Sequence, residues 1–147
     1  MITTVDVETS YQKTETGGYD PSPFHPDNIL VSVGLNSYFG DEYYFTNHSE
    51  RVDSGCAIKI QETLDKTTLL VGHNIKFDLM WLLESGFKYS GRVYDTMLGE
   101  YILNRGVRKS LTLEMSCRRR KIGSKDSSVK EWMDRGVSFE NIPKDIV

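Results

Sequence analysis

The sequence predicts an α/β domain with a mixed central sheet flanked by helices. Strand patterns come first along the chain and then alternate with helical patterns, which favours a mixed sheet. The 147 residues suffice for one domain with a real core. Charged residues make up 27% and hydrophobic residues 38%, as expected of a soluble globular protein.

The first half of the chain carries the strand patterns. Residues 1–8 predict a strand, with β-branched side chains at Ile2, Val5 and Val7. Residues 29–35 and 42–46 predict two more strands, joined as a hairpin around 36–41. Residues 9–28 are dense in Gly, Pro, Thr and Ser and predict a loop, of a length that is more often functional or mobile than idle.

The rest of the chain alternates short strands and helices. Apolar spacing predicts helices over 52–66, from 74 to near Gly86, from 95 through 103, over 110–121, and over 127–135 before Gly136. Short strands are expected at 69–71 and 92–94. The helix after Gly72 should present one apolar face formed by Ile75, Leu79, Leu82 and Leu83.

Helix caps follow from the polar residues before these helices. Asn74 suits an N-cap whose side-chain oxygen accepts a free amide of the first turn. Ser110 or Thr112 should cap the helix over 110–121. Trp81 is expected to be a core residue.

Composition excludes several classes of protein. No apolar run approaches the roughly 18 residues of a membrane span. The N-terminus lacks a basic region followed by an apolar one, so no signal peptide is predicted. Cys56 and Cys117 are lone thiols, which argues against a disulfide framework and a cysteine zinc site. We therefore expect a reducing, intracellular compartment.

Charge is distributed unevenly. Residues 1–100 carry 7 Lys and Arg against 15 Asp and Glu, a charge of −8, whereas residues 101–147 carry 11 against 6, a charge of +5. A basic segment beside an acidic one can hold a polyanion next to metal-binding carboxylates. The run from Arg118 to Lys121 could track phosphates, but a solvated helix face explains it equally well.

Three acids are the candidate chemistry. On a strand, the side chains of Asp6 and Glu8 point the same way, about 7 Å apart, and two like charges there need a cation or hydrogen-bond donors. Asp78 follows Asn74 by four residues, at the carboxyl end of a predicted strand where open α/β sheets bind ligands. Alone, this second stretch is equally consistent with a capped core helix. Together, the three acids describe a two-metal phosphoryl-transfer site.

These residues carry a resemblance to a known family. The stretch 5–9 (Val-Asp-Val-Glu-Thr) resembles the first motif of the DEDD 3′–5′ exonucleases, and 72–78 (Gly-His-Asn-Ile-Lys-Phe-Asp) resembles the second. Residues 94–104 are similar to the helix after that motif in proofreading domains of family A DNA polymerases. Residues 22–24 and 28–34 resemble the phage members of that group.

The resemblance implies a ribonuclease H-like fold, a cofactor and a role for each candidate residue. It implies two divalent metal ions, Mg²⁺ or Mn²⁺, with Asp6 bridging both, Glu8 on the ion that activates water, and Asp78 on the second ion. It further implies supporting or substrate-contacting residues, which are Thr9, Asn74 and Phe77 on the substrate side and His73 and Asp95 in support. Of these, His73 is expected to orient the loop around Asn74. The implied partners are the 3′ end of single-stranded DNA and a polymerase domain in the same parent chain, in the cytoplasm of a bacterial or phage-infected cell.

One departure from the family pattern matters. The third motif places Tyr four residues, or His five residues, before a last metal-binding Asp, and no acid after residue 78 has either spacing. His48 and Asp53 have the His spacing but precede the second motif. The prediction is a domain over 1–147 cut short of its fourth acid and weak or inactive alone. The alternatives are an exoribonuclease that acts as a separate protein, and a non-catalytic module that binds nucleic acid or a polymerase.

Overall fold

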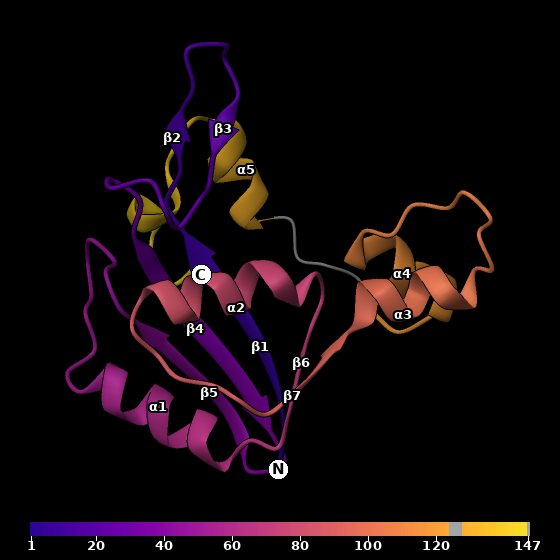
Figure 1. Cartoon of the computed structure of the whole chain (residues 1–147). Helices are drawn as coiled ribbons and strands as arrows, with labels where there is room; N and C mark the ends of the chain where they lie inside the picture. Colours follow the sequence, from indigo (N-terminus) through magenta and orange to yellow (C-terminus); the bar gives the residue numbers. More distant parts are fainter. Residues whose placement is uncertain (124–127, 147) are drawn as a thin grey trace.

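The computed structural model describes residues 1–123 and 128–146, and it is built on a mixed five-stranded sheet (Figure 1). The strand order is β5-β4-β1-β6-β7. β1 (Ile2–Thr9), β4 (Leu30–Ser37) and β5 (Gly40–Phe45) form an antiparallel meander. β6 (Leu69–Gly72) and β7 (Arg92–Asp95) add to β1 in parallel. The predicted α/β class and the 36–41 hairpin are confirmed.

The two faces of the sheet differ in polarity. Along β1, Thr3, Val5 and Val7 are buried, whereas the alternate residues Thr4 and Asp6 are exposed. This alternation is the period of two that a strand imposes on its side chains. We call the face that bears Thr4, Asp6 and Glu8 the polar face.

Helices α1 (Cys56–Lys66) and α2 (Ile75–Glu84) cover the other face (Figure 1). Their buried side chains join one core cluster with the inward residues of β1, β4 and β6, and Trp81 is in that core as predicted. Leu83 is 46% exposed, so its predicted place on the apolar face is wrong. Eight residues after Ile75, it is rotated to the edge of the apolar stripe.

The turn from β6 into α2 depends on two residues. A Cβ on Gly72 would lie 2.9 Å from Cγ1 of Ile75, so only glycine fits there. Asn74 has a left-handed backbone (φ 63°), a conformation that asparagine tolerates better than most residues. Its side chain makes no capping hydrogen bond, so the predicted cap is wrong. Capping side chains extend from β-region backbone, which Asn74 does not adopt.

Helices α3 (Thr96–Leu103) and α4 (Leu113–Arg120) lie side by side, away from the sheet (Figure 1). Asp95 caps α3 by accepting hydrogen bonds from the amides of Met97 and Leu98. Thr112, one of the two predicted caps, accepts from the amide of Met115. Both helices are thus capped at their N-termini, and residues 104–112 connect them.

The segment predicted as a loop over 9–28 contains a small hairpin. Its strands are β2 (Gln12–Lys13) and β3 (Tyr19–Asp20), which project beyond the sheet (Figure 1). The indole N–H of Trp81 donates to the carbonyl of Pro21 (3.1 Å), which ties the base of the hairpin to α2.

The C-terminal elements pack near the end of β1. α5 (Ser128–Asp134) is followed by a 3₁₀ turn, η1 (Phe139–Asn141), and Phe139 and Ile142 pack against Val31. Residue 127, the predicted start of α5, lies outside the described residues. Across the described ranges, no helix is long and apolar enough to cross a membrane.

Candidate active site

The buried carboxylate of Asp78 lies against the edge of β1. β6 pairs with β1 only over Ile2–Thr4, so beyond that point the edge of β1 faces α2. There Oδ1 of Asp78 accepts a hydrogen bond from the amide of Val7 at 3.1 Å. Asp78 is only 4% exposed. The Asp78 carboxylate of α2 thus accepts the hydrogen bond that a neighbouring strand would otherwise accept from the backbone amide of Val7.

Asp78 is electrostatically strained. Burial, followed by the negative charge of Asp6, raises the pKa of Asp78 from 3.8 to about 7, against the lowering effect of the bond from Val7. The charge of Asp95 adds a smaller upward contribution. Two of the three predicted acids therefore lie within electrostatic reach of each other, and one of them is buried.

Asp6 and Glu8 project from the polar face. In the register with β4, Asp6 lies opposite Gly34 and Glu8 lies opposite Ser32. Asp6 is exposed and Glu8 is half-buried. The register shifts between Glu8 and Thr9, so the strand is irregular just after the acids. Thr9, half-buried, sits at this irregularity.

The loop before α2 is held by contacts to His73 and Asp95. Both ring nitrogens of His73 are engaged, Nε2 with the carbonyl of Leu111 (2.7 Å) and Nδ1 with the hydroxyl of Thr96 (3.0 Å). Oδ1 of Asp95 accepts from the amide of Asn74 at 3.0 Å. These contacts fasten the loop to α3 and to the start of α4.

The two predicted substrate-contacting residues of the second motif differ in their surroundings. Asn74 is exposed beside this loop. Phe77 is half-buried and packs against the core cluster.

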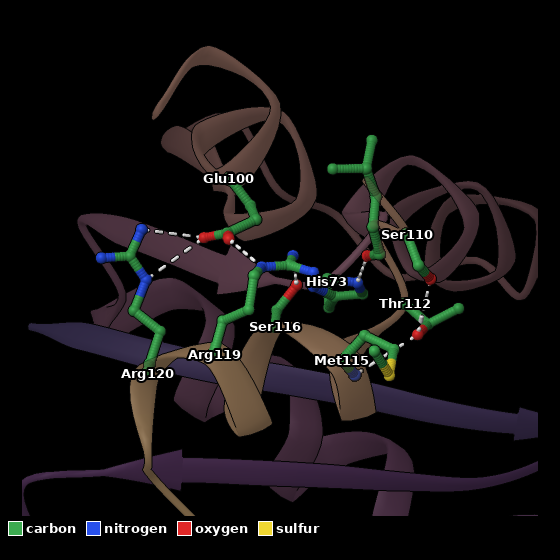
Figure 2. Close-up of polar contacts among 9 residues, drawn as sticks. His73, Glu100, Ser110, Thr112, Met115, Ser116, Arg119 and Arg120 are labelled. Atoms are coloured by element: carbon green, nitrogen blue, oxygen red, sulfur yellow. Dashed lines mark hydrogen bonds and ion pairs between the residues drawn. The ribbon is translucent and has the colours of Figure 1, made fainter. Parts of the chain in front are cut away.

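A second buried acid, Glu100 on α3, was not predicted from the sequence (Figure 2). Its carboxylate accepts from Nε of Arg119 (2.9 Å) and from Nη2 of Arg120 (2.9 Å), and these two arginines lower its pKa. Arg118 pairs with Glu114. Arg119 and Arg120 thus join α4 to α3. The sequence feature that could have predicted this contact is a single acid, Glu100, within an otherwise largely apolar helix.

A groove opens on the polar face beside Asp6. It has a volume of about 440 Å³ and is mostly apolar, and its lining includes Asp6, Tyr43, Val71, His73 and Leu113. Of the three candidate acids, Asp6 lines this concave surface between the sheet and the start of α4.

The donor set suits a hard divalent cation in kind. Carboxylate oxygens are the ligands that Mg²⁺ and Mn²⁺ prefer, and a cation would relieve the repulsion between Asp6 and Asp78. Among residues 1–123 and 128–146, however, no three His, Cys, Asp or Glu side chains gather closely enough to hold an ion. Asp6 and Asp78 therefore suit a divalent cation as a pair of carboxylates. Glu8 lies two residues from Asp6 on the same face of the sheet.

Comparison with known proteins gives the family. Residues 12–120 match the model of the 3′–5′ exonuclease family. The chain belongs to the 3′–5′ exonuclease family. The match includes Asn74, Asp78 and Asp95 of this exonuclease domain, and it begins after Asp6 and Glu8. No curated protein matches the sequence.

Solved structures show the same fold at low sequence identity. One, described as the apo form of the nuclease, is 15% identical with a TM-score of 0.58, over 86% of this chain and 55% of that one. Another is the family B DNA polymerase from the hyperthermophilic archaeon Pyrobaculum calidifontis, 16% identical with a TM-score of 0.57, over 87% of this chain and 19% of that one. The exonuclease domain thus spans about half of the first protein and a fifth of the second.

Proposed function

We propose that this domain hydrolyses 3′-terminal nucleotides of single-stranded DNA, as the proofreading part of a phage-type family A DNA polymerase of the DEDD group. The observation that carries the proposal is the buried carboxylate of Asp78, held against β1 beside Asp6. A strongly perturbed acid is typical of a catalytic site, and Asp6, whose charge contributes to the raised pKa of Asp78, lines the groove. Family membership supports the reaction, and the fold shared with a polymerase supports the context.

Asp6, Glu8 and Asp78 would hold two divalent metal ions. When bound, such ions make a water nucleophilic and stabilise the leaving 3′ oxygen. Contacts within the chain hold these acids and their neighbours in place. The Val7 amide fixes Asp78, and the strand fixes the spacing of Asp6 and Glu8. Asp95 and His73 hold the loop that presents Asn74.

Thr9, Asn74 and Phe77 would contact the 3′ end of the single-stranded DNA. They flank the acids along β1 and at the start of α2. Contacts to backbone and stacking bind single strands without reading their sequence. The single-stranded DNA would approach along the groove beside Asp6.

A nuclease assay tests the proposal. The purified chain, at high concentration with Mn²⁺ or Mg²⁺, should shorten a 5′-labelled single-stranded DNA one nucleotide at a time. Because the third motif does not occur in residues 1–147, we expect this activity to be low. Asp6→Asn and Asp78→Asn should reduce it by roughly 100-fold or more. Asp65→Asn, on the exposed side of α1, is the matched control.

The same assay separates the alternatives. An RNA of the same sequence that is cleaved faster than the DNA would favour the exoribonuclease. The observation in favour of a non-catalytic binding module is that, within the described part of the chain, no three acids lie close enough together to hold an ion. Binding of single-stranded DNA that is unchanged by Asp6→Asn, without any hydrolysis, would replace our proposal with that module.

A further inference from the structure

Tyr43 on β5 reaches across the polar face toward the acids of β1. Asp6, Gly34 and Tyr43 form one row across three strands, because Asp6 pairs with Gly34 and Gly34 pairs with Tyr43. A Cβ on Gly34 would lie 3.3 Å from Cδ2 of Tyr43 and 3.5 Å from its Cε2. The Tyr43 ring therefore lies over the bare backbone of β4.

The Tyr43 ring is held in place at its hydroxyl and at one edge. Its hydroxyl is 2.6 Å from that of Ser32, a residue with no exposed surface. Its ring packs edge-on against Phe45, with ring centres 5.2 Å apart. Ser32 lies opposite Glu8 in the register of β1 and β4. The Tyr43 hydroxyl is thus hydrogen-bonded to Ser32, the residue that lies opposite Glu8 in the sheet.

The electrostatics agree with this placement. Burial raises the pKa of Tyr43 to about 12, the bond to Ser32 opposes the rise, and the charges of Glu8 and Asp6 add to it. Both carboxylates therefore lie within electrostatic reach of the phenol. At neutral pH the phenol is protonated and can donate a hydrogen bond.

The neighbouring tyrosine behaves differently. Tyr44 belongs to the alternate set of β5 side chains and packs against the apolar core cluster. Tyr43 keeps 40% of its surface exposed and lines the groove beside Asp6. A ring that served only to pack would gain from deeper burial, whereas a ring that presents its hydroxyl to a site must stay at the surface.

We propose that Tyr43 is a positioning residue for the carboxylates of Asp6 and Glu8. The two hydroxyls share one hydrogen bond, in which either oxygen can donate. With Ser32 as the donor, the phenol proton is left to point toward β1, where it fixes the rotamer of Glu8 for a cation and its water. The inference rests on the proposed function, because it assigns Tyr43 to the same site. Outer hydrogen-bond partners of metal ligands typically contribute 10- to 100-fold to metal affinity or activity.

Mn²⁺ binding tests the inference without requiring turnover. The dissociation constant of Mn²⁺ is measured on the full chain from the paramagnetic resonance signal of the free ion. Tyr43→Phe, which keeps the ring and removes the hydroxyl, should raise that constant roughly 10-fold. Tyr44→Phe, which removes a hydroxyl from the adjacent residue, should leave it within about twofold. Circular dichroism should show both variants folded.

A double-mutant cycle tests the mechanism. If Ser32 acts only through the Tyr43 hydroxyl, Ser32→Ala in the Tyr43→Phe background should weaken Mn²⁺ binding no further. In the nuclease assay, Tyr43→Phe should lower kcat roughly 10-fold or more and leave KM for DNA within about twofold. A purely structural loss would instead lower the active fraction of both tyrosine variants together with their stability.

The outcomes distinguish two failures. If Asp6→Asn abolishes Mn²⁺ binding while Tyr43→Phe behaves like Tyr44→Phe, the role of Tyr43 is wrong and the proposed site stands. If the wild-type chain binds no Mn²⁺, or binds it equally after Asp6→Asn, the proposed metal site fails and the inference fails with it.

Discussion

Asp78→Asn should stabilise the metal-free protein, and the gain should depend on pH. The folded-state pKa of Asp78 is about 7 against 3.8 in the unfolded chain. At 1.36 kcal/mol per unit, ionising this buried carboxyl costs the fold about 4 kcal/mol. The asparagine keeps the acceptor oxygen for the Val7 amide and replaces the charge that repels Asp6 with an amide donor.

The sign follows from proton linkage. A group whose folded pKa is raised contributes stability that is complete below the unfolded pKa and is lost as pH rises through the folded pKa. For Asp78, that window runs from about 4 to about 7. Between pH 5 and pH 8 the wild type should lose about 2.5 kcal/mol of unfolding free energy through this group, and Asp78→Asn should lose none of it.

Denaturant unfolding of both proteins at pH 5 and pH 8 checks this expectation. The difference between variant and wild type should grow by about 2–3 kcal/mol toward pH 8, and Asp65→Asn should show no such growth. Parallel curves for Asp78→Asn and wild type would refute the electrostatic picture of the site. Added Mn²⁺ at pH 8 should stabilise the wild type and leave the variant unchanged, since a ligand stabilises only the state that binds it.

Two further predictions concern the scaffold around the site. Gly72→Ala should destabilise the protein by about 1–3 kcal/mol, measured by thermal unfolding, because the new Cβ would overlap the Ile75 side chain at the start of α2; an unchanged melting temperature would contradict this. Glu100→Gln should release α4 from α3, so trypsin should cleave this variant within 105–109 roughly fivefold faster than the wild type. Glu114→Gln removes only the pair with Arg118, so trypsin should cleave it at the wild-type rate.

The sequence predicted elements that are fixed by their own residues. β1 follows from the alternation of its side chains, and β4 and β5 follow from two strand-forming runs on either side of a turn. The start of α3 follows from Asp95, whose carboxylate can reach the next amides without help from elsewhere. The hairpin of β2 and β3 was missed because two-residue strands have no periodicity, although the adjacent Gly17 and Gly18 marked its turn. Local pattern therefore predicts an element only when it is long enough to repeat.

The site was less predictable, since its contacts depend on where elements end. The bond from Val7 to Asp78 exists because β6 stops pairing after Thr4, a length that no motif specifies. Tyr43 escaped notice because its importance depends on Gly34, a neighbour in the sheet but nine residues away in sequence. The candidate acids could be predicted from sequence motifs, whereas the groups around them could be identified only from the register of the strands.

Two buried acids in this domain invite opposite explanations. Glu100 faces two guanidinium groups, which lower its pKa, so its burial is compensated and its role in joining α3 to α4 is sufficient reason for it. Asp78 lies beside another carboxylate and costs about 4 kcal/mol near neutral pH, a large fraction of the 5–15 kcal/mol that stabilises a typical domain. An apolar or amide side chain would hold α2 against β1 at lower cost. The proposed cation site would account for this cost, and the gain in stability expected on Asp78→Asn measures how much stability the fold gives up at this position.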